Sequence, residues 1–237
     1  MLFRSERDYE IVHYDSPDER GVDVGLLYSS KNFRPLFSET LFVPLKNDDG
    51  TPRYTRDVLY VKGILKDDTI NIFVNHWPSR RGGEEASAPW RAVAAGVCRH
   101  KIDSLIALNK NARIVVMGDL NDDPVNESVT MVLKATGDSK KISSGKLFNP
   151  WMKLYKDGMG SLAYNDAWNL FDQIILSPAL LDSSQHHFAF RSAAVFSRDF
   201  MIQKTGRYKG YPKRTYNFNR YVGGYSDHFP TYIILSK

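Results

Sequence analysis

The sequence predicts a mixed α/β domain, and three observations lead to this fold class. Eight segments rich in β-branched and aromatic residues have the character of strands. One long segment, residues 90–109, has helical periodicity instead. Some strands are joined by short turns and others by helices, which argues against an all-parallel sheet. With 237 residues and 42% hydrophobic content, the chain is long enough for one sizeable core, so we expect a single domain over residues 1–237.

The strands follow from short apolar runs that are bounded by turn residues. The sequences Asn47-Asp48-Asp49-Gly50 and Lys66-Asp67-Asp68 are typical of turns, and the second predicts a hairpin. The long helix is expected to begin after Pro89, and a shorter helix is expected over 126–134. We expect strands at 22–28, 40–44, 58–65, 69–75, 113–117, 171–177, 188–196 and 231–235.

The segment about 136–168 has neither a helical nor an alternating period. Gly, Ser, Lys and Asn dominate it, which predicts a long surface loop between two strands.

The composition of the rest of the chain excludes several classes of protein. No stretch approaches the apolar length of a membrane span, and no signal-peptide core is present near Met1, so the compartment stays open. The single cysteine, Cys98, excludes an internal disulfide, and its helical spacing with apolar residues predicts a buried thiol.

The formal charge of +5 and the pI of about 9.1 suit a polyanionic partner. The charge is concentrated in residues 204–221, which contain six cations, five aromatic residues and no acid. Cations attract phosphates and aromatic rings stack on exposed bases, so this loop, with Lys213 and Arg214 at its centre, is a candidate nucleic-acid contact. The alternative is a solvated loop whose tyrosines pack onto the sheet.

Polar side chains capable of chemistry lie at three predicted strand ends. His76 and Asp119 each follow an apolar run, and Asp227 and His228 precede one. Asn121 lies two residues after Asp119, which places both side chains on the same side of a strand. Carboxylate and amide oxygens without a thiolate cluster favour Mg²⁺ or Mn²⁺ over structural zinc. Each motif also has a structural alternative, namely an Asx turn at 119–123, a hydrogen-bonded Asp-His turn, or a packed loop histidine.

In this order the motifs resemble the endonuclease/exonuclease/phosphatase superfamily, the DNase I-like metal-dependent phosphoesterases. The segments 20–28, 55–58 and 171–177 also match, so the resemblance covers nearly the whole chain. It implies a four-layer α/β/β/α sandwich, in which helices cover two packed sheets. The family begins with two strands that carry an Asn and a metal-binding Glu, and nothing before Arg20 resembles them. We therefore expect a chain that lacks the first strands of the domain.

The resemblance also implies a role for each site residue. His228 is implied as the general base or phosphate-contacting imidazole, oriented by Asp172. Asp119 and Asn121 match the pair that positions the attacking water and a phosphoryl oxygen. His76 matches a second histidine, a phosphate ligand or proton donor.

The remaining assignments concern metal and substrate. Asp227 matches a carboxylate on the metal side, which the resemblance assigns to Mg²⁺ or Mn²⁺. Arg56 matches a phosphate-contacting arginine in DNase-like members, although a surface ion pair is the alternative. Arg80 follows His76 closely enough to reach substrate phosphate. Strand direction suggests that Asp23 orients His76.

Three classes of function remain open. The first is a divalent-metal-dependent nuclease or phosphodiesterase, with nucleic acid as partner. The second is a phosphatase acting on a lipid, inositol or nucleotide phosphate. The third is a binding module or inactive fragment that lacks the metal-binding Glu. The basic charge and Arg56 favour the first, and no obligate protein partner is evident from the sequence.

Overall fold

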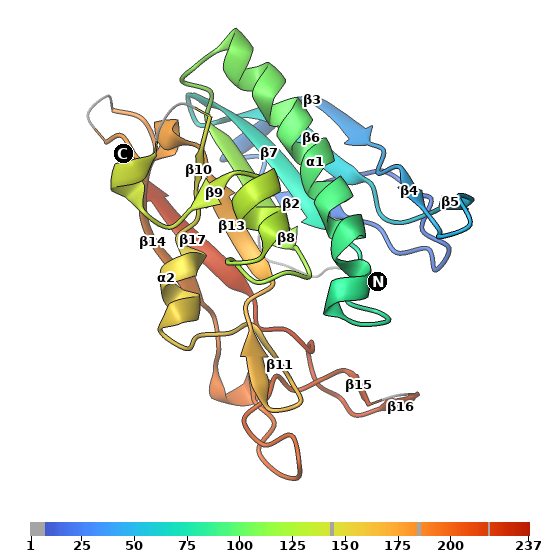
Figure 1. Cartoon of the computed structure of the whole chain (residues 1–237). Helices are drawn as coiled ribbons and strands as arrows, with labels where there is room; N and C mark the ends of the chain where they lie inside the picture. The colour runs from blue at the N-terminus through green and yellow to red at the C-terminus, as the bar shows by residue number, and fades with distance from the viewer. Residues whose placement is uncertain (1–7, 143–144, 184–185, 218) are drawn as a thin grey trace.

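The computed structural model describes residues 8–142, 145–183, 186–217 and 219–237, and its centre is a seven-stranded sheet (Figure 1). Its strand order is β3-β6-β7-β8-β13-β10-β9. The β7–β8 pair is parallel and the β8–β13 pair is antiparallel, so the sheet is mixed, as the combination of hairpins and crossovers predicts. The strands are β3 (Phe33–Leu41), β6 (Val58–Leu65), β7 (Asp68–His76), β8 (Ile114–Asp119), β9 (Ala135–Thr136), β10 (Leu147–Phe148) and β13 (Asp172–Leu176).

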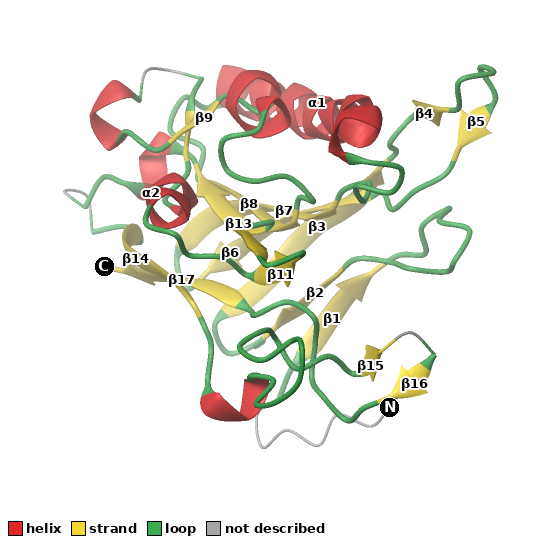
Figure 2. Cartoon of the chain, turned by 60° about the horizontal axis from the view of Figure 1, so that its bottom comes forward, coloured by secondary structure: helices red, strands yellow, loops and turns green. Residues whose placement is uncertain are grey.

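Two α-helices lie over one face of this sheet and two antiparallel strand pairs lie under the other (Figure 2). The helices are α1 (Glu84–Leu108) and α2 (Trp151–Lys156). The strand pairs are β1 (Glu10–His13) with β2 (Gly25–Tyr28), and β14 (Ala189–Val195) with β17 (Thr231–Ser236).

Burial of apolar side chains on both faces of the sheet explains these layers. One core cluster joins the sheet to α1 through residues such as Phe73, Ala95 and Val116. A second cluster joins the opposite face to the strand pairs through residues such as Leu26 and Val61. The predicted mixed α/β class is therefore confirmed, and the described residues form three layers: helices, central sheet and strand pairs.

Short elements complete the chain. Three small hairpins extend from the sheet, and one π-helical and three 3₁₀ turns lie between strands. They are β4 (Leu45–Lys46), β5 (Pro52–Arg53), β11 (Leu162–Tyr164), β12 (Ala167–Asn169), β15 (Tyr216–Asn217), β16 (Arg220–Tyr221), η1 (Ser128–Val132), η2 (Ser139–Lys141), η3 (Pro178–Leu180) and η4 (Asp199–Met201).

Several predicted boundaries are wrong. Helix α1 begins at Glu84 and carries Pro89 inside it, because buried Arg91 donates to the Glu84 carbonyl at 2.9 Å and anchors the first turns. The helix expected over 126–134 is only the π-helical turn η1. The strand expected at 40–44 is the end of β3, which begins earlier and contains a bulge.

The segment 136–168 is more regular than the sequence predicts. It contains β10, α2 and β11, and its middle is anchored in the interior by fully buried Leu147 and Trp151. Two apolar anchors of this size override a composition that is typical of loops. The thiol of Cys98 is buried as predicted, and burial raises its pKa to about 12. No helix in the described parts of the chain has the length and apolar character needed to cross a membrane.

Candidate active site

Three neighbouring strands place His76, Asp119 and Asp172 side by side at one edge of the central sheet. His76 at the end of β7 is in register with Asp119 at the end of β8, and Asp119 is in register with Asp172 at the start of β13. His228 comes from the loop before β17, and its Nδ1 lies 2.8 Å from Oδ2 of Asp172. The Oδ2 of Asp119 lies 3.5 Å from Nε2 of His76 and 4.0 Å from Nδ1 of His228. Four of the five predicted catalytic side chains therefore meet in one cluster.

Asn121, the fifth predicted residue, is held against the same edge by a tight turn after β8. Its backbone is left-handed at φ 50°, and its N–H donates to Oδ1 of Asp119 at 2.9 Å. Its Nδ2 donates to the carbonyl of Trp77 at 2.9 Å. This bond fixes the orientation of the amide group. The amide oxygen, Oδ1, accepts no hydrogen bond from any described residue, so it remains available to a ligand.

Gly118 brings β8 close enough to β7 for this arrangement. Its φ is 130°, and a Cβ atom added there would lie 1.9 Å from the carbonyl oxygen of Asn75. Only glycine fits, because both the backbone conformation and the space exclude a side chain. Asn75 and Gly118 directly precede His76 and Asp119, so this close approach sets their spacing.

The environment separates the protonation behaviour of the clustered groups. Burial raises the pKa of Asp119 to about 6, and the neighbouring Asp172 carboxylate acts in the same direction. Burial lowers the pKa of His76 to about 4, helped by the Arg56 guanidinium. For His228, burial opposes the charged form, yet the hydrogen bond and charge of Asp172 outweigh it and raise the pKa to about 9. The cluster thus offers a neutral imidazole, a charged imidazole and a carboxylate that titrates near neutrality.

Ser161 is a residue of this site that the sequence does not reveal. Its Oγ donates to Oδ2 of Asp172 at 2.5 Å, and its carbonyl accepts the N–H of Phe229 at 2.7 Å. It therefore ties Asp172 to the loop that carries His228. The signal is missing because Ser161 lies in the irregular segment 136–168, where no motif marks it.

Asp23 does not orient His76, as strand direction suggested. Its carboxylate lies 3.2 Å from Nε2 of His13 and accepts the N–H of Ser16 at 2.7 Å. The acid that contacts His76 is Asp119, its register partner on β8.

Arg56 is buried beneath His76, and its predicted contact with phosphate requires correction. It donates to the carbonyls of His76 at 3.1 Å and Trp77 at 2.7 Å, and to Oδ2 of Asp18 at 3.0 Å. Its side chain is only 4% exposed. Because three of its donors are bound to protein oxygens, Arg56 fixes the backbone at the end of β7 and is not free to bind substrate.

Arg80 is also engaged by the protein and not directed at substrate. It donates to the carbonyl of Asn121 at 2.9 Å, and it pairs with Glu84 at 2.6 Å and Asp123 at 3.2 Å. Its guanidinium also stacks on the ring of Phe171, 4.4 Å from the centroid. Arg80 is thus a cross-link that holds the turn after β8. The sequence prediction for Arg80 is wrong because its partners in this turn lie about 40 residues away along the chain.

The basic loop 204–221 extends beyond β11, on the side of the sheet where the site lies (Figure 1). Two of its tyrosines face solvent, since Tyr216 is 57% exposed and Tyr221 is 66% exposed, whereas Tyr211 packs against Trp168 of the β11–β12 hairpin, with 6.1 Å between the ring centroids. Lys213 and Arg214, the predicted substrate contacts, make no ion pair with a described residue. Their carbonyls accept backbone hydrogen bonds from Tyr225 and Gly224, which fixes the loop just before Asp227.

Asp227 has an exposed side chain that forms no hydrogen bond or ion pair with the described residues. One exposed carboxylate of this kind suits a hard cation that keeps several waters and also binds substrate phosphate. A second possible ligand group exists in the described residues, His13, Asp15 and Asp23, whose ligand atoms lie within 4.8 Å of one another. His13 and Asp23 already contact each other, so the closeness of these surface side chains needs no bound ion.

Comparisons with known proteins bear on the family and the fold of the chain. Residues 3–237 match the model of a family described as Endonuclease/Exonuclease/phosphatase family. No curated protein matches the chain. Among solved structures, a humanized D. rerio TDP2 has 16% sequence identity and a TM-score of 0.60, covering 97% of this chain and 77% of its own.

Two further structures have similar scores. D. rerio TDP2 complexed with single strand DNA product has 15% identity and a TM-score of 0.59, covering 97% of this chain and 77% of its own. The mannosyl-6-phosphatase Bt3783 of Bacteroides thetaiotaomicron has 17% identity and a TM-score of 0.55, with the same coverages of 97% and 77%. At these identities the likeness concerns the fold, and it agrees with the expected DNase I-like architecture.

Proposed function

Because the chain belongs to the endonuclease/exonuclease/phosphatase family, a family of phosphoesterases, we propose that it is a divalent-metal-dependent phosphodiesterase acting on nucleic acid. The observation that carries this proposal is the ion pair of His228 and Asp172 beside Asp119 and His76. Phosphoester hydrolysis needs a group that activates water and groups that neutralise the phosphoryl oxygens. This cluster holds both kinds at one sheet edge.

The roles follow from the environments. Asp119, with a pKa near 6, is ionised at neutral pH and basic enough to accept a proton from the attacking water. Its neighbour Asn121 presents the free amide oxygen that orients this water. His228 is fixed through Nδ1 by Asp172, which leaves Nε2 as the donor to a phosphoryl oxygen. His76 is neutral and offers a hydrogen bond without adding charge.

A divalent cation fits the donors at this edge. Enzymes of the family generally use a divalent metal. Asp227, which is exposed, is the residue that would hold Mg²⁺ or Mn²⁺ together with waters and the substrate phosphate. The ion would supply electrostatic stabilisation of charge on the phosphate. The protein side chains supply orientation and proton transfer, as described above.

Nucleic acid is the proposed substrate because of the charge and the exposed rings around the site. The formal charge is +5, and Arg214, Tyr216 and Tyr221 are exposed in a loop that contains no acid. Cationic and aromatic side chains together bind phosphates and stack on bases. A similar fold in complex with single-strand DNA product supports this choice. The fold of a mannosyl-6-phosphatase is also similar, so a phosphate monoester is the second substrate class to test.

The first experiment measures hydrolysis of plasmid DNA, bis-p-nitrophenyl phosphate and p-nitrophenyl phosphate with Mg²⁺, Mn²⁺ or EDTA. The variants are His228→Ala and, as a matched control, His100→Ala, whose exposed histidine lies on α1 outside the site. We expect metal-dependent cleavage of DNA and of the diester, lost by at least about 100-fold in His228→Ala and unchanged in His100→Ala.

The outcomes separate the substrate classes. Cleavage of p-nitrophenyl phosphate alone would assign the site to a phosphatase. Equal activity of His228→Ala and the native protein would overturn the proposed site. If no substrate is hydrolysed but the protein binds DNA with an affinity that falls as the salt concentration rises, the chain would be assigned to a binding module.

A further inference from the structure

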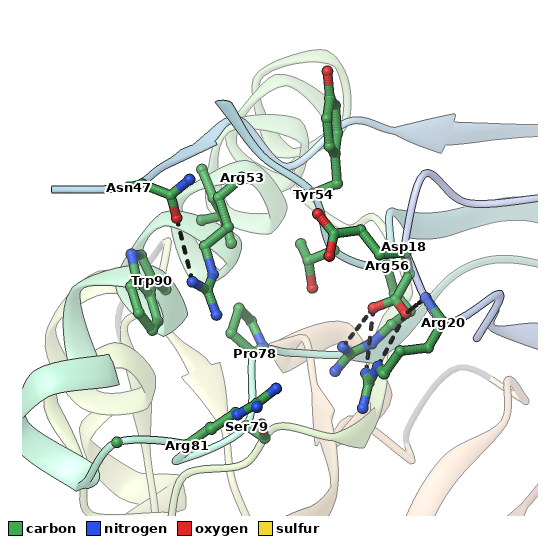
Figure 3. A pocket seen from close by; sticks show the side chains of 14 residues that line it. Asp18, Arg20, Asn47, Arg53, Tyr54, Arg56, Pro78, Ser79, Arg81 and Trp90 are labelled. Carbon is green, nitrogen blue, oxygen red and sulfur yellow. Dashed lines mark hydrogen bonds and ion pairs between the residues drawn. The ribbon is translucent and has the colours of Figure 1, made fainter. Parts of the chain in front are cut away.

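A pocket of about 490 Å³ lies next to the site, between the loop 14–24, the β4–β5 hairpin and the loop after His76 (Figure 3). Four arginines line it, against two acids. None of the residues in its wall belongs to the catalytic cluster. The lining side chains that carry the argument are Asp18, Arg20, Arg53, Arg56, Pro78 and Arg81.

Two of these arginines are satisfied by the protein. Arg20 and Arg56 both bind Asp18, at 3.2 and 3.0 Å, and hold the pocket wall together. Figure 3 shows these three side chains gathered at one side of the hollow. The single Asp18 carboxylate, which is buried, binds both guanidinium groups, so this part of the wall keeps one excess positive charge.

The other two arginines have no acidic partner among the described residues. Arg53 donates only one long hydrogen bond, to Oδ1 of Asn47 at 3.4 Å, and its guanidinium carbon lies 3.9 Å from the centroid of the Trp90 ring. This stacking fixes the planar group while leaving most of its N–H donors free. Arg81 is exposed and forms no hydrogen bond or ion pair with the described residues. The pocket therefore carries two uncompensated cations from different loops, Arg53 and Arg81, which face the hollow in Figure 3.

The wall of the pocket contacts the backbone of His76. Pro78, in its wall, is two residues from His76, and Arg56 donates to the carbonyl of His76 from the same wall. The charges of Arg56 and Arg20 also contribute to the low pKa of His76. A substrate whose reacting phosphate lies at His76 would thus extend a neighbouring group into this pocket.

We propose that this pocket binds the phosphate next to the one that is hydrolysed in a nucleic-acid strand, through Arg53 and Arg81. The inference rests on the proposed function and adds a specificity determinant to it. Guanidinium groups bind phosphate oxygens with paired hydrogen bonds, which suits two arginines that face one hollow. The pocket would therefore favour strands with at least two phosphates over a dinucleotide with one.

The test compares two substrates that differ in the flanking phosphate. Values of kcat/KM are measured for a dinucleotide with a single phosphodiester and for a tetranucleotide of the same base. The proteins are the native chain, Arg53→Gln, Arg81→Gln, the double variant, and Arg191→Gln as a control on β14 outside the pocket. Thermal unfolding confirms that each variant folds.

We expect the ratio of kcat/KM for the tetranucleotide to kcat/KM for the dinucleotide to fall about tenfold for each arginine replaced. Each substitution removes a charged hydrogen bond to the flanking phosphate. Arg191→Gln should leave the ratio as it is. An equal loss on both substrates, or no loss on either, would overturn the subsite.

A separate measurement distinguishes failure of the subsite from failure of the proposed function. Binding of a fluorescent tetranucleotide is followed by anisotropy against salt concentration, without divalent metal, and needs no turnover. The salt slope should decrease by about 1 for each arginine removed if the pocket holds a phosphate. If neither substrate is hydrolysed and this slope still decreases, the proposed activity is wrong and the phosphate site stands. An unchanged slope overturns the phosphate site whatever the activity.

Discussion

Oδ2 of Asp172 lies 2.8 Å from Nδ1 of His228, and it also accepts the Oγ–H of Ser161 at 2.5 Å. The carboxylate starts a central strand, whereas the imidazole lies on a loop 56 residues further along the chain. The pair therefore joins the sheet to the segment before β17. It also fixes the orientation of the His228 ring, so the position of Nε2 depends on a residue that does not contact substrate in our proposal.

Replacing Asp172 by Asn tests this relationship. Asn keeps the shape of the side chain but removes the charge that raises the pKa of His228. We expect kcat to fall by about 100-fold or more, with KM changed less, because the imidazole loses its orientation and charge at the phosphate. Steady-state kinetics on bis-p-nitrophenyl phosphate measures both constants. NMR of the imidazole should show its pKa lowered.

The matched control is Asp199→Asn, which removes an exposed carboxylate that pairs only with Lys204 at the surface. Its kinetic constants should stay within about twofold of the native values. If Asp172→Asn keeps native kcat and the same histidine pKa, the orienting role is refuted.

Arg80 and its neighbour Arg81 are expected to differ in their effect on stability. Arg80→Met leaves the buried carboxylate of Asp123 without its ion pair and should lower the free energy of unfolding by about 3 kcal/mol. Arg81→Met removes an exposed side chain and should change it by less than about 0.5 kcal/mol. Urea unfolding of both variants gives the comparison. Equal stability of the two variants would contradict the cross-linking role and leave the phosphate contact predicted from sequence as the role of Arg80.

The sequence predicts which side chains lie together in the candidate site, because local patterns determine strand ends. Apolar runs end at His76 and Asp119, and the strands that these runs form are neighbours in one sheet, so register alone brings the two side chains together. The motif around His228 precedes another strand. The order of these motifs along the chain supplied the family resemblance, and the resemblance supplied Asp172 as the partner of His228.

The sequence fails where a residue's role depends on distant partners. Arg56 and Arg80 look like surface cations beside a site, yet their carbonyl and carboxylate partners come from other loops and enclose them. Ser161 has no signal at all, because nothing local shows that it will reach Asp172. Pro89 predicts a helix start, but the buried contacts of Arg91 extend the helix beyond it. In each case a tertiary contact outweighs a local preference.

Gly118→Ala should damage both folding and the site. The new methyl group would lie 1.9 Å from the carbonyl oxygen of Asn75, and alanine is also unfavourable at φ 130°. We expect a loss of more than about 3 kcal/mol in unfolding free energy. Gly158→Ala is the control, since its φ is also positive at 84° but nothing lies within 4 Å. It should cost about 1 kcal/mol, so a similar cost at both positions would show that the β7–β8 approach is not the constraint.

The pair of Asp18 and Arg56 should make stability depend on pH in the acid range. Burial works to raise the pKa of Asp18, but hydrogen bonds from Arg20 and Arg56 hold it at about 2, below the ordinary 3.8. Between these values the unfolded state binds more protons than the folded state. The stabilisation is therefore complete above about pH 4 and is lost as pH falls toward 2, with a size of about 2 kcal/mol.

Asp18→Asn removes this titration and leaves the buried Arg56 guanidinium without a carboxylate. The variant should be less stable than the native protein by about 3 kcal/mol at pH 7, and the difference should shrink between pH 4 and pH 2.5. Urea unfolding at several pH values measures the difference directly, so the titration of other carboxylates cancels. Asp67→Asn, at an exposed pair with Lys237, should show no comparable trend. A difference that stays constant down to pH 2.5 would mean that Asp18 is not ionised by its arginine partners, and that Arg56 is held beneath His76 by its backbone carbonyl contacts alone.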